Sequence, residues 1–352
     1  MDIVKVLASW LAGQPPQVED YEKLLVAAQE EPAQAAGLDC EMTVAGMAMR
    51  AKEFVAIAPR IIQLCESMKF TDQNAILRTL WELWLPLAMQ LRRARQQQDQ
   101  PLIQGILGGQ GTGKTTISRV LQEILGSWNY PCIAISIDDL YKTYAERQKL
   151  LETQPRLIWR GPPGTHDIDT GLEVLTQLQR ANIDDKIAIP RFDKSLHNGQ
   201  GDRVAPEEVD PAEIILFEGW FVGCRPVTPE VFDNPPRPIE TSEDQQFARD
   251  MNEALKAYLP LWEKLDRLIV LYPEDYRLSK QWRKDAEHIM MAKGKTGMSD
   301  AEIDDFVDYF WRSLHPELFI TPLTQDSDWT DLVIEIDAKH RPCKIYRPDS
   351  PA

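Results

Sequence analysis

The 352-residue sequence lacks the features of several large protein classes. It contains no apolar run of about 18 residues, so it predicts no membrane-spanning helix. Its five cysteines include no C-x-x-C pair, which argues against a disulfide framework and a zinc ribbon. The first residues acquire acidic side chains early and lack both a basic start and a small-residue cleavage site. We therefore expect a cytoplasmic protein, or a stromal one if a transit peptide precedes Met1.

Positive charge is also scarce. Lys and Arg number 39 against 55 Asp and Glu, which gives a formal net charge of −16. Nucleic acids and anionic membranes are held by clustered Lys and Arg, so neither is an expected partner. The 43% hydrophobic content is enough for a sizeable core, in one large α/β domain with an appendage or in two units. Any anionic ligand must therefore be held by a local basic site.

The first hundred residues favour helices. Apolar side chains recur three and four positions apart in Gln17–Glu30, Met47–Met68 and Asn74–Gln98. Pro86 should kink or split the third segment, because proline cannot donate the helical hydrogen bond. Polar residues from Arg92 to Pro101 resemble a fraying helix end and a linker. We predict a helical N-terminal region at 1–98 and a second domain at 99–352.

After Pro101, short apolar runs alternate with helical stretches. Strands are expected at Leu102–Leu107, Cys132–Ile137, Ile214–Phe217, Leu268–Tyr272 and Leu332–Ile336. This alternation predicts an α/β fold with a parallel sheet between helices, which include Thr115–Leu125 and Glu243–Leu265. Three interruptions are expected to be loops: Arg160–Asp169, the irregular stretch Pro190–Pro211, and Pro226–Pro238. Long loops inside a compact domain are usually functional.

The strongest motif is GGQGTGKTT, which directly follows the first expected strand. Gly108-x-x-x-x-Gly113-Lys114-Thr115 fits the P-loop pattern, in which glycines let backbone N–H groups surround phosphate oxygens. The lysine ammonium would contact the β- and γ-phosphates, and the threonine hydroxyl would face Mg²⁺. The residues assigned to ATP are Gly108, Gly109, Gln110, Gly111, Thr112, Gly113, Lys114, Thr115 and Thr116.

Carboxylates end two of the other expected strands. Glu218 closes the run Glu213–Gly219 in the manner of a Walker B strand and would face Mg²⁺ through water. Asp138 and Asp139 follow the second strand, at the sheet edge where ligands of parallel sheets bind. One of the two could accept a substrate hydroxyl proton, or both could simply cap the next helix. We assign Mg²⁺ to Thr115, Glu218 and Asp138.

The P-loop alone does not identify a reaction, because kinases, GTPases and motor ATPases share it. The sequence has no N-K-x-D guanine-reading motif and no L-S-G-G-Q element, which counts against GTPases and transporter ATPases. A small-molecule kinase is the first hypothesis. A nucleotide-dependent regulatory or assembly protein is the second, and it would bind a partner through its helical N-terminus.

The strand followed by Asp138-Asp-Leu-Tyr141 resembles the group of uridine kinases, phosphoribulokinases and pantothenate kinases. Further stretches resemble the plant-type D-glycerate 3-kinases: Arg160-Gly-Pro-Pro-Gly-Thr-His-Asp167, Pro190-Arg-Phe-Asp-Lys-Ser195, Gly199-Gln-Gly-Asp-Arg203, Phe217-Glu-Gly-Trp220, Asn252-Glu-Ala-Leu-Lys-Ala-Tyr258 and Trp282-Arg283. The resemblance implies ATP- and Mg²⁺-dependent conversion of D-glycerate to 3-phosphoglycerate in the photorespiratory glycolate route. It also implies that Asp138 is the catalytic aspartate.

A hydroxy-acid acceptor needs cations for its carboxylate and partners for its hydroxyls. The two expected loops supply Arg160, His166, Arg191, Lys194, His197 and Arg203. As acceptor-binding residues we predict His166, Asp167, Arg191, His197 and Arg203, with the first three favoured. Phe192 stands where the uridine kinases carry a tyrosine, which argues against a nucleoside. A nucleoside or pantothenate remains the alternative acceptor.

A basic segment follows the fourth strand. The resemblance implies that residues 274–297 form a lid over ATP, with Arg277 and Arg283 covering the transferred phosphoryl group. Arg277, Lys280 and Lys284 should share one strip of its helix, and Met290–Gly297 could be its flexible end. Ser299 and Glu302 have capping-box spacing and should open a helix at Asp300–Leu314. The aromatic side chains of that helix, Phe306, Tyr309, Phe310 and Trp311, are expected in the core.

Overall fold

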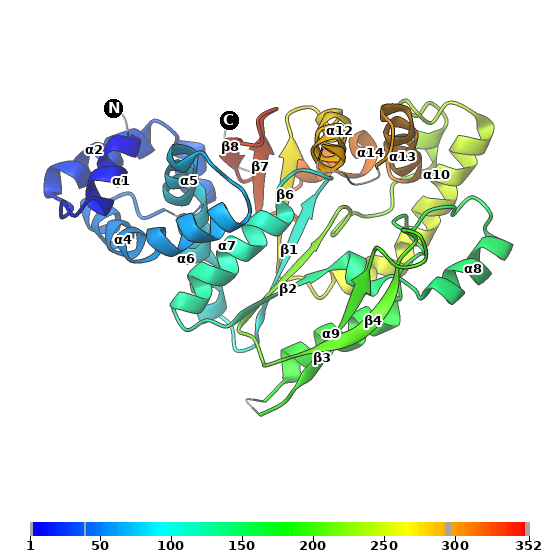
Figure 1. Ribbon diagram of the computed structural model, residues 1–352, viewed down its shortest axis with the longest axis horizontal. Coiled ribbons are helices and arrows are strands. Elements are labelled where there is room, and N and C mark those ends of the chain that lie inside the picture. The colour runs from blue at the N-terminus through cyan, green and yellow to red at the C-terminus, as the bar shows by residue number, and fades with distance from the viewer. Residues whose placement is uncertain (1–2, 39, 183, 293–296, 349–352) are drawn as a thin grey trace.

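The computed structural model describes residues 3–38, 40–182, 184–292 and 297–348, and its centre is a six-stranded sheet (Figure 1). The strand order is β2-β5-β1-β6-β7-β8. The first five of these pair in parallel, and β8 runs antiparallel to β7. The bounds are β1 Leu102–Gly108, β2 Cys132–Ser136, β5 Ile214–Gly219, β6 Arg267–Pro273, β7 Leu332–Ile336 and β8 Pro342–Tyr346. The five expected strands and the α/β class are confirmed, whereas β8 was not foreseen.

Alternate residues of the strands face two separate apolar cores. Leu102 and Ile106 of β1 pack with the N-terminal helices and α7, Lys114–Ser127. Ile103 and Leu107 pack on the other face with α9, Ile168–Arg180, and the Ser242–Trp262 helices. A strand that is apolar at every position is what a sheet covered on both faces requires.

The N-terminal region forms helices α1 to α6 as the periodicity predicts. Their bounds are α1 Ile3–Leu11, α2 Val18–Gln29, α3 Pro32–Gly37, α4 Val44–Ser67, α5 Gln73–Thr79 and α6 Leu85–Gln96. The expected break at Pro86 is present as a π-helical turn, Leu80–Trp84, between α5 and α6. Pro86 has no N–H for the carbonyl of Glu82, and the side chain of Gln34 donates to that carbonyl instead (2.8 Å).

The helical region packs directly on α7, the helix that follows the phosphate loop (Figure 1). The Trp128 indole N–H donates to Glu53 (2.7 Å), and Arg92 lies over the same indole (4.3 Å). Apolar residues of α4 and α6 belong to one cluster with those of β1 and β7. The predicted boundary at residue 98 remains a prediction, but no gap in the core marks it among the described residues.

The expectation of irregular structure at Pro190–Pro211 is wrong. Most of this stretch is an antiparallel hairpin of β3, Ile187–Asp193, and β4, Asp202–Val209, which stands apart from the main sheet (Figure 1). No residue of β4 is fully buried and most are exposed, so the strand shows no alternation of apolar and polar residues. The hairpin packs against the short 3-10 helix η2, Ile137–Leu140.

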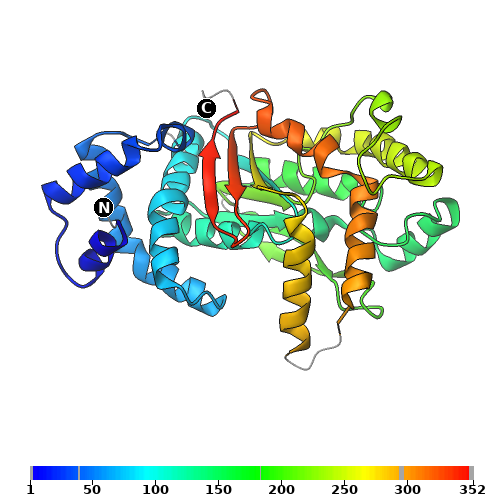
Figure 2. The same cartoon turned by 90° about the horizontal axis from the view of Figure 1, so that it is seen from above.

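The remaining helices lie in the connections between the strands. They are α8 Tyr144–Thr153, η3 Pro229–Phe232, α10 Ser242–Leu255, η4 Lys256–Tyr258, α11 Leu259–Trp262, α12 Leu278–Met291, α13 Asp300–Ser313, α14 Pro316–Phe319 and η5 Thr321–Gln325. Helices α12 and α13 lie side by side (Figure 2). Among the described helices, none has the length and apolar character needed to cross a membrane.

Candidate active site

The phosphate loop joins β1 to α7 and places its backbone at the carboxyl edge of the sheet. Gly111 and Gly113 have φ angles of +80° and +89°, which glycine adopts without strain. A side chain at Gly111 would also meet the ring and Cβ of Trp282 at 2.9 Å. The backbone turn of the loop therefore requires glycine at both positions, and the packing of Trp282 on the loop requires it at Gly111.

Lys114 opens α7 and folds back over the loop. Its ammonium donates to the carbonyls of Gly108 (2.6 Å) and Gly109 (2.9 Å). Burial lowers the pKa of Lys114, while the nearby carboxylates of Glu218 and Asp138 oppose that shift. The lysine thus lies where it can exchange carbonyl partners for phosphate oxygens.

Oxygen ligands suitable for Mg²⁺ lie beside the loop. Glu218, at the end of β5, accepts hydrogen bonds from the hydroxyls of Thr115 (3.2 Å) and Ser118 (3.2 Å). Among the described residues no three His, Cys, Asp or Glu side chains cluster as a metal site. Mg²⁺ bound with phosphates needs only one or two protein oxygens, so this donor set fits it. Ser118 is a contact that the sequence motif did not single out.

The element after β2 separates the roles of two neighbouring aspartates. Ser136 pairs with Glu218 in the sheet register, so residues just beyond it lie beside this predicted metal ligand. Asp139 accepts from the Ser136 backbone N–H (3.1 Å) and forms a capping box with it. The capping role therefore belongs to Asp139, and Asp138 is left for chemistry.

Asp138 is held by two donors. The Lys194 ammonium on the hairpin lies 2.5 Å from its carboxylate, and the Tyr141 hydroxyl also donates to it. Burial acts to raise the pKa of Asp138, but the charge and hydrogen bond of Lys194 and the Tyr141 hydroxyl together lower it. The carboxylate is therefore ionised at neutral pH, as a proton acceptor must be.

The other predicted acceptor residues except His166, on the hairpin and the 160–169 loop, are already paired with charged side chains of the protein. Arg191 contacts Asp139 and Glu207 (both 2.8 Å), and His197 contacts Asp202 (3.1 Å). Arg203 donates to Asp167 (3.0 Å) and to the carbonyl of Tyr141 (2.8 Å), which ties the hairpin to the 160–169 loop. Asp167 also caps α9 through the N–H of Thr170 (3.1 Å). Their direct contact with an acceptor remains a prediction.

Two residues that the sequence did not favour also shape this region. Arg147 on α8 is buried and donates to the carbonyls of Gln200 (2.7 Å) and Gly201 (2.6 Å) at the hairpin turn. No local signal marks its link to the hairpin, because these two partners lie more than 50 positions away. Arg160 donates to Gly199 (2.8 Å) and lies over the rings of Tyr141 and Phe192. Within the described ranges Arg160 has no ion-pair partner.

His166 lies at the centre of the 160–169 loop. Its ring is buried, and it stacks on Tyr141 at a centroid distance of 4.6 Å. Burial lowers the pKa of His166 to about 3. His166 is therefore a neutral member of the group, unlike the arginines around it.

The predicted lid helix is present as α12, but its basic strip faces α13. Lys280 and Lys284 pair with Asp308 (2.7 Å) and Asp304 (2.9 Å). The capping box at Ser299 that opens α13 is confirmed, and all four aromatic residues named for that helix are at least partly buried. The proposed flexible end includes residues 293–296, which lie outside the described residues.

The two lid arginines are also engaged. Arg277 contacts Asp275 (3.2 Å), and Arg283 contacts the buried Glu287 (3.1 Å). Trp282 is the lid residue that touches the phosphate loop, and it packs on His340, whose ring bonds the carbonyl of Gly111 (2.9 Å). A catalytic contact of either arginine with a phosphoryl group remains a prediction.

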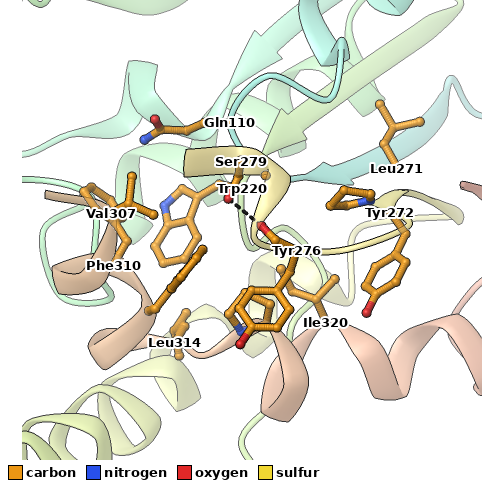
Figure 3. Close-up of a pocket in the computed structure, with 14 residues that line it drawn as sticks. Gln110, Trp220, Leu271, Tyr272, Tyr276, Ser279, Val307, Phe310, Leu314 and Ile320 are labelled. Atoms are coloured by element: carbon orange, nitrogen blue, oxygen red, sulfur yellow. Dashed lines mark hydrogen bonds between the residues drawn. The ribbon is translucent and has the colours of Figure 1, made fainter. Parts of the chain in front are cut away.

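An apolar pocket opens beside the start of the phosphate loop (Figure 3). Gly109 and Gln110 form its edge, and Trp220, two residues after Glu218, forms a wall. Other walls come from Tyr276, which lies just before α12, and from Val307 and Phe310 of α13. Sequence periodicity placed Phe310 and Trp311 in the core and did not reveal that they line a cavity.

Comparison with known proteins was made on the whole chain. It is 32% identical over 255 residues to the chloroplastic D-glycerate 3-kinase of Arabidopsis thaliana, covering 69% of this chain and 54% of that protein. It is 31% identical over 228 residues to the uncharacterized kinase mug58 of Schizosaccharomyces pombe, covering 62% and 82%. No protein-family profile matches the chain. The chain thus spans about half the length of the Arabidopsis enzyme and most of the yeast one.

A solved structure shows the same arrangement. The D-glycerate 3-kinase from Cryptococcus neoformans var. grubii superposes with a TM-score of 0.65 at 26% identity, covering 73% of this chain and 94% of that one. The similarity therefore includes the fold and about three quarters of this chain.

Proposed function

Because this chain belongs to the family of P-loop kinases that includes the D-glycerate 3-kinases, we propose that it transfers the γ-phosphoryl group of ATP to D-glycerate, giving 3-phosphoglycerate. One observation supports a kinase of a small acceptor above all. Asp138 is an ionised carboxylate at the sheet edge shared by Lys114 and Glu218, and the cation Lys194 lies on it. The hydroxyl of an acceptor could give its proton to Asp138, and the carboxylate of the same acceptor could bind Lys194.

The residues divide the reaction between them. The loop amides and Lys114 bind the phosphates, and Thr115 and Glu218 would hold Mg²⁺, with Asp138 beside them. When bound, Mg²⁺ neutralises charge on the phosphate oxygens. Asp138 accepts the proton of the attacking hydroxyl.

The acceptor carboxylate needs cations that are not already used. Lys194 has three N–H donors and contacts Asp138 with one side of its ammonium, so it can hold the acceptor carboxylate at the same time. Arg160 on the facing loop offers a second cation. Arg277 and Arg283 would reach the phosphoryl group only after they leave Asp275 and Glu287, which is the rearrangement that lid closure would bring.

The test is ADP release with ATP and Mg²⁺, comparing D-glycerate, L-glycerate, pantothenate and uridine. We expect fast turnover with D-glycerate only. Asp138→Asn should lower kcat about 10³-fold with little change in the KM for ATP, because it removes the proton acceptor and leaves the phosphate loop intact. Asp210→Asn, which changes an exposed carboxylate at the far end of the hairpin, is the matched control. Full activity of Asp138→Asn would contradict the assignment.

The apolar pocket favours a second candidate acceptor. Glycerate is small and polar, whereas a hydroxy acid with an aliphatic body, such as pantothenate, could bury that body against Val307 and Phe310. In that case pantothenate would be the faster substrate, and Phe310→Ala would raise its KM. If D-glycerate is the substrate, Phe310→Ala should leave the KM for D-glycerate almost unchanged.

A place in the photorespiratory glycolate route follows from the proposed substrate, and a cytoplasmic or stromal location remains a prediction. The regulatory alternative predicts slow ATP hydrolysis that no hydroxy acid stimulates. The same assay therefore separates it from a kinase.

A further inference from the structure

His166 is enclosed by aromatic side chains. Its ring is 2% exposed, stacks on Tyr141 with a 24° angle between planes, and meets Phe221 and Tyr258 at centroid distances of 5.6 Å. Burial keeps the pKa of His166 far below neutrality, so the ring carries one proton at physiological pH. The question is which nitrogen holds that proton.

The hydrogen bonds of Tyr258 answer it. The Tyr258 hydroxyl accepts from the N–H of Gly164 (2.9 Å) and lies 2.7 Å from His166 Nδ1. Tyr258 is fully buried, and among the described residues only His166 can accept its hydroxyl proton. If Nδ1 were protonated, that hydroxyl proton would be buried without an acceptor, which is costly. Nδ1 is therefore the acceptor, and the proton is on Nε2.

The Nε2 atom is buried and has no hydrogen-bond partner in the part of the chain that the structure describes. Residues next to the ring lead to the reacting carboxylate. Tyr141 forms an isolated β-bridge with His166, stacks on it, and donates to Asp138. The charge of Asp138 also acts on the imidazole. A buried donor without a partner, one ring away from the proton acceptor, indicates a missing ligand oxygen.

We propose that Tyr258 fixes His166 in the Nε2–H tautomer, and that this neutral N–H donates a hydrogen bond to an oxygen of the acceptor. Tyr258 is then a positioning residue, and His166 is a binding residue that cannot act as a base, because Nδ1 is occupied and Nε2 is already protonated. The acceptor part of the inference rests on the proposed kinase function, whereas the tautomer does not.

The tautomer is measured without substrate. In protein labelled with ¹⁵N at its five histidines, His166 should show a protonated Nε2 and an unprotonated Nδ1 over about pH 5 to 8, since it does not titrate there. The His166→Gln spectrum assigns the resonance. Tyr258→Phe should mix the two tautomers, because Nδ1 loses its donor. A protonated Nδ1 in the unaltered protein would overturn the proposal.

The donor role is measured by adding the acceptor. D-Glycerate, with an unreactive ATP analogue, should shift the Nε2 resonance of His166, and Tyr258→Phe should raise the KM for acceptor about tenfold with little change in the KM for ATP. Tyr309→Phe is the control, since its buried hydroxyl donates to the carbonyl of Arg156 (3.1 Å). An unmoved resonance in a turning-over enzyme would overturn the donor role.

The two proposals fail differently. If another acceptor is phosphorylated and D-glycerate is not, the proposed substrate is wrong, and the same titration with the true acceptor decides the role of His166. If nothing is phosphorylated and no acceptor moves the resonance, the donor role is overturned together with the kinase function, while the tautomer stands or falls by its own spectrum.

Discussion

The phosphate loop and the β3–β4 hairpin meet at the same edge of the sheet, yet they hold their charged groups in different ways. The loop is one contiguous segment, and its cation Lys114 bonds only neighbouring carbonyls. On the hairpin, Arg191, Lys194 and Arg203 each pair with a carboxylate more than 30 positions away in sequence. A local motif can therefore describe the predicted phosphate site, whereas the proposed acceptor site depends on pairs that only the fold creates.

The largest expected effect, and the strongest test of this difference between the two regions, comes from removing the cation of the phosphate loop. Lys114→Ala should lower kcat/KM for ATP about 10³-fold with any acceptor, because phosphate charge is then unopposed at the loop. Steady-state ADP release measures it. The exposed Lys52 on α4 provides the control substitution Lys52→Ala. An effect confined to one acceptor would show that Lys114 belongs to acceptor binding instead.

A smaller effect is expected on the hairpin side. Lys194→Met should raise the KM for a carboxylate acceptor about tenfold. It should also move the acidic limb of the pH profile of kcat/KM to higher pH, since the lysine lowers the pKa of Asp138 and its removal lets that pKa rise. Measuring rates from about pH 4 to 8 checks both effects.

The control for this variant lies on the same hairpin. Lys186 pairs with Asp210 at the far end of β3. Lys186→Met should therefore change neither the KM for the acceptor nor the acidic limb of the pH profile of kcat/KM. An acidic limb that stays in place in Lys194→Met would mean that Asp138 is not the group being titrated.

The smallest effect should come from Ser118, whose hydroxyl donates a hydrogen bond to Glu218, a predicted ligand of Mg²⁺. Ser118→Ala removes one of two hydroxyl donors to Glu218 and should raise the Mg²⁺ concentration for half-maximal rate about threefold. A titration of Mg²⁺ at saturating ATP measures it. Ser127→Ala, at the other end of α7, should not alter the Mg²⁺ requirement.

Sequence patterns predicted the buried strands and the motifs whose residues are close together in the chain. The five parallel strands carry continuous apolar runs, and the phosphate loop and the Ser299 capping box are short motifs with fixed spacing. The β3–β4 hairpin was not predicted, because β4 is exposed along most of its length and half of its residues are charged. The Asp202–Val209 stretch contains both a proline and three acidic residues, so neither pattern nor propensity marks it as a strand.

The side-chain pairs within the site were not predicted from the sequence for another reason. The alternative that aspartates merely cap a helix was correct for Asp139 and not for Asp138, although they are adjacent. The capping box with Ser136 distinguishes Asp139 locally, whereas Arg191 and Lys194, the charged partners of the two aspartates, come from the hairpin more than 50 positions away. The sequence likewise named Lys280 and Lys284 as part of a basic strip, but their partners on α13 neutralise that strip.

The packing of α4 and α6 against α7 has a practical consequence for anyone shortening the chain. A fragment that starts at residue 99 would retain the whole phosphate loop but would expose the apolar side of α7, including Val120 and Ile124, to water. Such surface invites aggregation, and the strands behind it would lose one of their two covers. Truncation would therefore damage nucleotide binding through insolubility, even though the removed segment contains no catalytic group.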